Sequence, residues 1–362
     1  MNSYRFLPAR DRPVLSLAPL CTRMVAAYRD RAGTVHLFTD AYDPRRETAF
    51  DDPLDSWEAE PRYLTTTDFD SWQDHGFALT RGRWRGGVAR SDGDCVGAAS
   101  PGVVVAGGRV LLFYAGKGPA NPAGPFARTT NREDLPGLIH LAVAPADENG
   151  APAGPFEKRG PVTDYDAGWR SIRHDDPNAV VTGEEVLLFF KGIGPGQTHA
   201  NRVFGVARTP IDRPEGPYRI HPEPVLRTDR GVESPRVFRA GGRWQMFALQ
   251  YSLPGDDRPR RYGHFRGRDP LRWELVNDEV LATTSDRPQH GAADMCPLWT
   301  PFEPGPPKLA FSNRLDDGAW GDPGVFKQWL WEIEEVPVEG CLGAQERSER
   351  GRRLPGSQPG PV

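Results

Sequence analysis

The chain is poor in cysteine and methionine, with four of each among its 362 residues. The cysteines lie far apart and show no CxxC spacing, so they fit reduced structural thiols better than zinc ligands or a disulfide framework. An HExxH motif and an EF-hand loop are also missing. The glycines at 192–196 are not followed by the Lys-Ser/Thr pair of a phosphate-binding loop. The sequence therefore indicates no metal centre, nucleotide site or other cofactor.

An excess of charge of either sign is absent as well. The 45 Lys and Arg residues against 49 Asp and Glu give a net charge of -4 at pH 7, which argues against a nucleic-acid or anionic membrane partner. No run approaches the roughly 18 apolar residues of a membrane helix. The apolar stretch from Val14 to Cys21 is interrupted by Pro19 and is short for a secretion signal. We expect a soluble, cytoplasmic protein whose ligand is small or neutral.

Glycine and proline are abundant instead, with 40 and 37 residues spread between short apolar runs. This composition suits many short strands joined by turns. A phrase of an apolar strand, a tight turn and a second strand ending at an aromatic position recurs five times, at 24–38, 102–113, 178–189, 236–247 and 298–311. Its landmark residues are Phe38, Phe113, Phe189, Phe247 and Phe311.

The intervals between these copies are long enough for four strands each. Four-stranded antiparallel units repeated radially make a β-propeller, which avoids long exposed sheet edges. A β-sandwich is the alternative, but it does not require the same phrase five times. The sequence predicts an all-β, five-bladed propeller forming a single domain over 1–339. Residues 340–362 are charged, rich in proline and glycine and without apolar periodicity, so we expect a disordered tail.

Two carboxylates stand near the starts of neighbouring inner strands. Asp176 directly precedes the proline ahead of the third copy, and Glu233 lies two residues before the proline ahead of the fourth. Carboxylates that meet in one cavity can differ in pKa, so that the drier one keeps its proton as an acid. Cleavage of a glycosidic bond uses such a pair. Both residues could instead accept backbone N–H bonds between blades.

In order and spacing, these motifs resemble the five-bladed propeller glycosidases, most closely glycoside hydrolase family 43, with families 32, 117 and 130 as relatives. The phrase at 99–114 resembles the family's second-blade hairpin, and the phrases ending at Trp72 and Trp273 resemble its blade ends. Asp-Pro at Asp176 and Glu-Ser-Pro at Glu233 resemble its two acidic motifs. The resemblance implies that Glu233 is the general acid and that Asp176 orients it and modulates its pKa. Trp72 and Trp273 are expected to pack between blades.

One departure concerns the family's third carboxylate, the base or nucleophile. It belongs ahead of the first inner strand, where this chain has Arg23 and no acid. Asp294, ahead of the fifth inner strand, is the expected substitute. The residues expected to contact the sugar are Trp169, His174, Asp175, Arg23, Arg236, His199 and His290. A structural histidine is the alternative for His174, and a solvated loop is the alternative for His199.

The sequence thus predicts a glycoside hydrolase acting on a short glycoside or oligosaccharide. It would invert the anomeric centre if Asp294 activates water from the opposite face. Two alternatives stay open. In a phosphate-dependent phosphorylase resembling family 130, phosphate attacks without a protein base, and Arg23 occupies the place of the missing acid. The other alternative is a carbohydrate-binding propeller without turnover. The expected partner is a small carbohydrate in each case.

Overall fold

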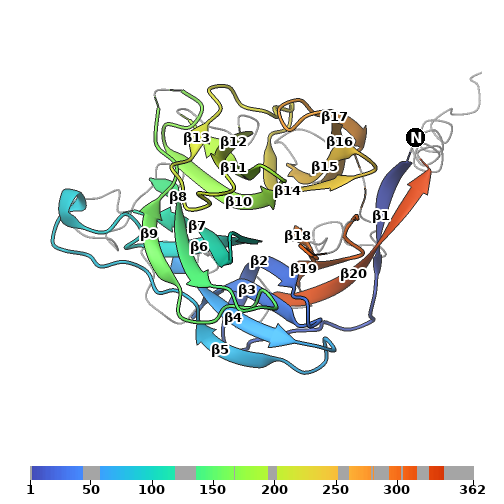
Figure 1. The fold of residues 1–362 in the computed structure, drawn as a ribbon, viewed down its shortest axis with the longest axis horizontal. Coiled ribbons are helices and arrows are strands. Elements are labelled where there is room, and N and C mark those ends of the chain that lie inside the picture. Colours follow the sequence, from blue (N-terminus) through green and yellow to red (C-terminus); the bar gives the residue numbers. More distant parts are fainter. Residues whose placement is uncertain are drawn as a thin grey trace, which may run out of the picture.

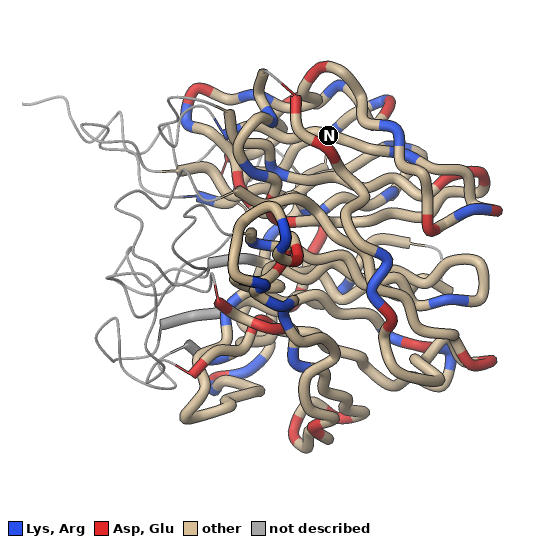
Figure 2. Tube along the Cα trace, turned by 90° about the vertical axis from the view of Figure 1, so that its left-hand side faces the viewer, with Lys and Arg blue, Asp and Glu red and all other residues tan. Residues whose placement is uncertain are grey.

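The computed structural model describes residues 2–43, 58–118, 136–166, 168–194, 202–251, 261–278, 280, 293–302, 305–315 and 326–337. In these ranges the chain forms β-strands β1 to β20 and a 3-10 helix at Val88–Arg90, but no α-helix (Figure 1). None of its described helices is long and apolar enough to cross a membrane. Lys and Arg are interspersed with Asp and Glu along the described trace, as the view in Figure 2 shows. The all-β prediction is confirmed.

Two of the sheets are antiparallel meanders of four strands taken in chain order. The first contains β2 (Cys21–Arg29), β3 (Val35–Tyr42), β4 (Glu60–Thr66) and β5 (Gln73–Phe77). The second contains β14 (Val232–Ala240), β15 (Arg243–Gln250), β16 (Arg261–Gly267) and β17 (Glu274–Asn277). In both, the hairpin predicted from the sequence supplies the two strands nearest the centre of the molecule (Figure 1).

A larger sheet of eight strands contains two such meanders. One half is β6 (Gly97–Ala106), β7 (Arg109–Lys117), β8 (Gly137–Pro145) and β9 (Glu157–Pro161). The other half is β10 (Arg173–Val181), β11 (Glu185–Ile193), β12 (Val203–Pro210) and β13 (Arg219–Ile220). The halves are joined by a single parallel residue pair between Arg173 and Gly137. The strands thus form four hydrogen-bonded sheets, and the number of blades stays a prediction.

The remaining sheet combines the two ends of the described chain. Its order is β1 (Asn2–Pro8), β20 (Phe326–Pro337), β19 (Leu309–Leu315) and β18 (Ala293–Pro297). Figure 1 shows β1, coloured blue, alongside β20, coloured red. The sequence analysis did not identify β1 as a strand. Because β1 and β20 lie at opposite ends of the described chain, their pairing holds these two ends together.

The inner strands β2, β6, β10, β14 and β18 contact one another in this cyclic order, and β18 returns to β2. Hydrophobic side chains fill the spaces between successive sheets, and all five landmark phenylalanines are fully buried there. The rings of Trp72 and Phe311 are 6.2 Å apart, and those of Trp273 and Phe189 are 6.1 Å apart. Each tryptophan thus packs against the landmark phenylalanine of the preceding repeat, as predicted.

Candidate functional site

Every inner strand carries the same irregularity close to its start. The pairing of β10 with β11 skips from Asp175 to Asn178, and that of β14 with β15 skips from Glu233 to Arg236. Strands β2, β6 and β18 show the same interruption. Bulges of this kind bend a strand and re-aim its side chains. The residues at the first bulge position in three strands, Ser100, Asp176 and Ser234, have φ between 54° and 55°, in the left-handed region that such residues rarely adopt.

This register corrects one detail of the sequence interpretation. Asp176 and Glu233 were expected ahead of their strands, but both lie within the strands, at positions that differ by one residue. The residue equivalent to Glu233 is Asp175, and the residue equivalent to Asp176 is Ser234. The spacing to the prolines gives the same offset, because Asp176 lies one residue before Pro177 and Glu233 lies two residues before Pro235. By the same register, Arg23 on β2 and Asp294 on β18 match Asp176.

A buried lysine joins the two principal carboxylates. Lys191 lies on β11, directly opposite Asp175 in the antiparallel ladder. Its Nζ is 2.8 Å from Asp176 Oδ2 and 2.7 Å from Glu233 Oε1. Because both oxygens are close to the same nitrogen atom, the two carboxylates are also close to each other. The structure brings Asp176 and Glu233 to the same end of the ring, as the glycosidase interpretation requires.

A second cluster of ions lies beside the first. Asp175 contacts Lys117 Nζ through Oδ1, and its Oδ2 is 2.7 Å from Arg173 Nε. Lys191 Nζ is 3.9 Å from the same carboxylate. All four side chains are buried. The sequence analysis placed Asp175 in the sugar pocket, whereas its described contacts are with these cations.

Burial and neighbouring charge act differently on the two lysines. Burial would lower the pKa of Lys191, but Asp176 and Glu233 outweigh it and raise this pKa above its ordinary value. For Lys117, burial together with the charges of Arg173 and Lys191 lowers the pKa well below the usual range. Of the two lysines, Lys191 is therefore the one that stays positively charged over the physiological range of pH.

Glu233 is the most accessible carboxylate in the cluster. Its side chain is 12% exposed, compared with 4% for Asp176 and 5% for Asp175. Arg202 Nη1 approaches Glu233 Oε1 at 3.9 Å and also donates to the hydroxyl of Tyr251. Because a ligand enters from solvent, Glu233 is the acid of this group that it would meet first. In the ion pair with Lys191, Glu233 carries a negative charge.

Asp176 also performs the structural task that was the alternative to a catalytic role. Its Oδ2 accepts a hydrogen bond of 3.2 Å from the backbone N–H of Ser234 on the next inner strand. Asn178 accepts a similar bond of 2.9 Å from the N–H of Val237. The carboxylate of Asp176 therefore both faces Lys191 and fixes the backbone beside Glu233.

Asp40 also lies close to the bulges of the inner strands, although it is not among the residues predicted from the sequence. Asp40 is fully buried on β3, and its Oδ1 accepts a 2.8 Å hydrogen bond from the backbone N–H of Ser100. Asp40 thus accepts a hydrogen bond from the backbone at the bulge of β6, as Asp176 does at the bulge of β14. A carboxylate within the apolar stretch 35–42 was the available signal, since buried charges need partners.

His174 and Trp169 are held by packing. The two ring nitrogens of His174 lie 2.8 Å from Thr163 Oγ1 and 3.0 Å from the carbonyl of Arg170. Burial lowers the pKa of His174 to about 4, so the ring is neutral near pH 7. Trp169 donates a 3.0 Å hydrogen bond to the carbonyl of Pro222. These contacts favour the structural alternative for His174.

The Trp169 ring lies against two glycines. A Cβ atom at Gly192 or Gly205 would stand 2.4 or 2.2 Å from the ring. The absence of a side chain at both positions therefore creates the space that the ring occupies.

Arg236 and Arg23 occupy distinct surroundings. Arg236 is 1% exposed, and it donates to the carbonyls of Met295 at 2.8 Å and Val25 at 3.4 Å, which joins β14 to β18 and β2. Arg23 is half-buried, and its carbonyl accepts a 3.3 Å bond from Gln328. The predicted sugar contacts His199 and His290 lie outside the described residues, as does the side chain of Asp294. Within the described ranges, no three His, Cys, Asp or Glu residues form a group that could hold a metal ion.

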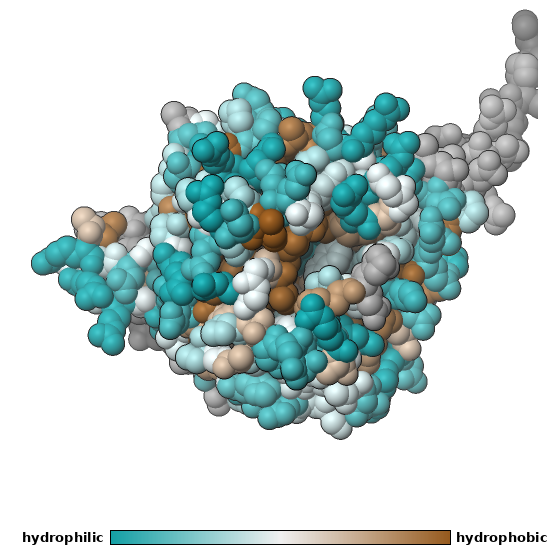
Figure 3. All heavy atoms as spheres, in the orientation of Figure 1, coloured by the Kyte–Doolittle hydropathy of each residue, from teal (hydrophilic) through white to brown (hydrophobic). Residues whose placement is uncertain are grey.

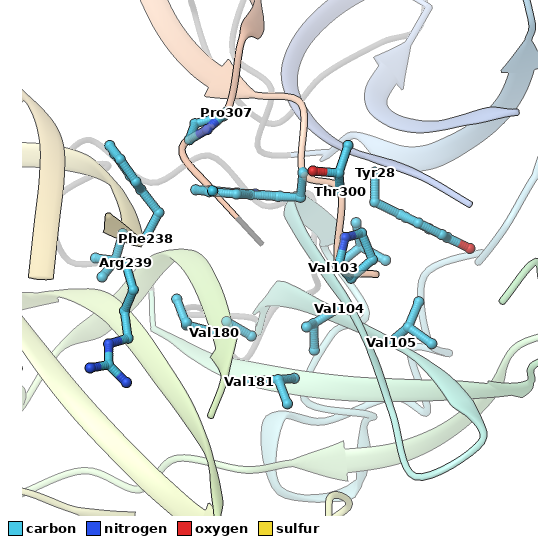
Figure 4. A pocket seen from close by; sticks show the side chains of 15 residues that line it. Tyr28, Val103, Val104, Val105, Val180, Val181, Phe238, Arg239, Thr300 and Pro307 are labelled. Carbon is cyan, nitrogen blue, oxygen red and sulfur yellow. The ribbon is translucent and has the colours of Figure 1, made fainter. Parts of the chain in front are cut away.

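A separate pocket opens at the other end of the inner strands. It has a volume of about 320 Å³ and is lined by Val103–Val105 of β6, Val180 and Val181 of β10, and Phe238 of β14 (Figure 4). Figure 3 shows an apolar hollow at the centre of the corresponding face. Val180, Val181 and Phe238 belong to the final parts of β10 and β14, whose first parts carry the carboxylates. None of the predicted site residues lines this pocket.

The fold of the chain is similar to that of several solved glycoside hydrolases. No family model matches the chain, and no curated protein sequence matches it either. The structure of Zg3597, a family 117 glycoside hydrolase from the marine bacterium Zobellia galactanivorans, is 17% identical. The match covers 92% of this chain and 90% of that one, with a TM-score of 0.64.

Two other solved structures agree with this result. The family 32 β-fructofuranosidase BmSUC1 of Bombyx mori is 14% identical over 90% of this chain and 63% of its own, with a TM-score of 0.59. A thermostable family 43 glycoside hydrolase is 12% identical over 87% of this chain and 90% of its own, with a TM-score of 0.50. At these identities the likeness establishes the fold. The chain has the propeller fold found in glycoside hydrolases of families 117, 32 and 43, the families that the sequence motifs resemble.

Proposed function

We propose that the protein is a glycosidase acting on a short glycoside or oligosaccharide. The observation that supports this most is the meeting of Asp176 and Glu233, from neighbouring inner strands, at the ammonium of Lys191. Glycoside cleavage needs a carboxyl group that keeps its proton as a general acid, and a charged carboxylate beside it raises the pKa of that acid. The fold shared with glycoside hydrolases supports the same reaction class.

In this proposal Glu233 is the general acid and Asp176 its charged neighbour. Glu233 is the more exposed of the two, so it can reach the leaving oxygen of a bound sugar. It gains a proton when its ion pair with Lys191 opens, and it passes that proton to the leaving oxygen as the glycosidic bond breaks. Asp294, which shares the register position of Asp176, deprotonates the attacking water, and the reaction inverts the anomeric centre.

The proposed architecture has five blades. The single residue pair between β10 and β8 is the only described pairing that joins the halves of the eight-stranded sheet. Counting these halves separately gives each inner strand of the ring its own blade. The recurring bulge on all five inner strands supports this count.

A carbohydrate-binding propeller without turnover is a second candidate, and one observation favours it. Glu233 is ion-paired with Lys191 at 2.7 Å, whereas a general acid must hold a proton before it can act. If the pair persists when sugar binds, the site recognises hydroxyl groups but does not cleave the bond.

The deciding experiment supplies the purified protein with aryl arabinosides, xylosides, galactosides and mannosides, and with sucrose, with and without phosphate. Sucrose is included because one similar structure is a β-fructofuranosidase in complex with it. Mass spectrometry identifies the products. A free sugar supports hydrolysis, whereas a sugar phosphate formed only with phosphate indicates phosphorolysis. Binding of a sugar without any product would replace the glycosidase proposal with the binding protein.

A further inference from the structure

Two carboxylates held close together in a buried place ordinarily cannot both be charged. Their mutual repulsion makes them share a proton, which is how one of a pair becomes an acid. Asp176 and Glu233 meet this condition of proximity, but the ammonium of Lys191 lies between them. A positive charge thus stands where a shared proton would otherwise be required.

We propose that Lys191 is a positioning residue that replaces this shared proton and thereby sets the pH range in which Glu233 can be protonated. The effect of Lys191 on catalysis rests on the proposed function. Its effect on the charges of Asp176 and Glu233 does not, and it can be measured without any substrate.

The geometry holds Lys191 in place from several sides. Its backbone is fixed opposite Asp175 in the ladder between β10 and β11. Its side chain is 4% exposed, so solvent and salt screen its charge only weakly. The titratable or charged groups around the three side chains are Asp175 and Arg173 from β10, Lys117 from β7, Arg202 before β12, Tyr251 after β15 and Asp40 from β3.

The neighbouring lysine provides a matched control. Lys117 is equally buried and contacts Asp175, whereas Lys191 Nζ lies within 2.8 Å of both Asp176 and Glu233. A general effect of losing a buried lysine side chain should appear in both lysine variants. An effect specific to the pair of carboxylates should appear only when Lys191 is changed.

The first test compares the pH dependence of turnover in wild type, Lys191→Met, Lys191→Arg and Lys117→Met. Without the cation, Glu233 keeps its proton to higher pH. The limb on which activity falls with rising pH should therefore move upward by about one to three pH units in Lys191→Met. Lys191→Arg retains the charge and should keep the wild-type limb even if its rate falls. Lys117→Met should move the limb much less.

The second test needs no substrate and therefore separates this inference from the proposed function. In Lys191→Met the folded state should hold an additional proton on its carboxylates at low pH, and it must release that proton as the pH rises. The loss of melting temperature relative to wild type should consequently be larger at pH 8 than at pH 5. Lys191 itself stays charged across this window, because its raised pKa lies above it.

Lys191→Gln provides the same comparison if Lys191→Met does not fold, since glutamine is also uncharged. The inference is supported by a melting-temperature difference that grows between pH 5 and pH 8 in the neutral variant and stays constant in Lys191→Arg. It is overturned if the neutral and charged variants behave alike. Absence of turnover in wild type would reject the proposed function, while the melting experiment would still decide the role of Lys191.

Discussion

Asp176 on β10 accepts a hydrogen bond from the backbone N–H of Ser234 on β14, over 3.2 Å. Ser234 directly follows Glu233, so a carboxylate of one inner strand fixes the main chain that carries the proposed acid of the next. The same oxygen lies 2.8 Å from Lys191. One side chain therefore links the geometry of the bulge to the charge of the site.

Asp176→Asn should reduce turnover without abolishing it. The amide keeps a similar shape, but the negative charge beside Glu233 disappears, so Glu233 loses its proton at lower pH. The limb on which activity falls with rising pH should move to lower pH, opposite to the shift expected for Lys191→Met. Steady-state rates across the pH range would measure this.

Asn178→Ala is the matched control for that variant. It breaks the 2.9 Å bond to Val237, which joins the same two strands away from Lys191. It should cost about 1–3 kcal/mol of stability and leave the pH limb in place. A limb that moves equally in both variants would assign Asp176 a purely structural role.

Arg236→Met should destabilise the fold by roughly 2–4 kcal/mol, because two buried carbonyls on neighbouring strands lose their donor. Urea unfolding would measure the free energy. The sequence analysis placed Arg236 in contact with sugar. A variant with wild-type stability and a strongly raised KM would restore that assignment.

His174→Gln should make stability less sensitive to acid. The pKa of His174 is about 4 in the folded protein because the ring is buried, whereas an unfolded histidine has a pKa near 6.5. Between these values the unfolded chain binds more protons, so this histidine makes stability fall with falling pH by up to about 1.4 kcal/mol per unit.

The measurement is the free energy of unfolding in urea between pH 4.5 and pH 8. Below about pH 6.5 the slope of wild type should exceed that of the variant, and above it the two slopes should coincide. Equal slopes throughout would show that His174 is protonated equally in both states.

Asp294→Ala and Arg23→Ala separate hydrolysis from phosphorolysis. If Asp294 deprotonates water, its loss should lower hydrolysis by about 10²- to 10⁴-fold, and azide should partly restore turnover because it attacks without a base. If phosphate attacks instead, Arg23→Ala should impair turnover and Asp294→Ala should be almost neutral. Product analysis with and without azide and phosphate distinguishes the two. Loss of activity in both variants without azide rescue would contradict both assignments.

Much of the fold follows from local sequence. The five hairpins were predictable because alternating apolar residues and glycine turns are local signals. The pairing of β1 with β20 was not predictable, because no local sequence pattern specifies a pairing between strands at opposite ends of the chain. In the first repeat, moreover, Val25 pairs with Thr39 rather than with the landmark Phe38. A shift of one residue moves a side chain to the other face of a sheet, and only the pairing reveals it.

The candidate site was predictable in part. The proline motifs pointed to Asp176 and Glu233, which the structure brings to one lysine. Lys117 and Lys191 went unnoticed because they lie in the last three residues of second strands that otherwise read as hydrophobic hairpins. Lysine is rarely buried unless it is paired, so its recurrence in two such strands was a usable signal. The bulges themselves could not be predicted, since a bulge is defined by the pairing between two strands.

Turnover by Glu233→Gln, compared with wild type on the best glycoside of the panel, tests the central claim most directly. Glutamine keeps the shape of the side chain but has no proton to give to the leaving oxygen. The glycosidase account predicts a folded variant, with an unchanged circular dichroism spectrum and measurable sugar affinity, whose turnover falls by at least about 10²-fold. Wild-type turnover in a folded Glu233→Gln protein would contradict it.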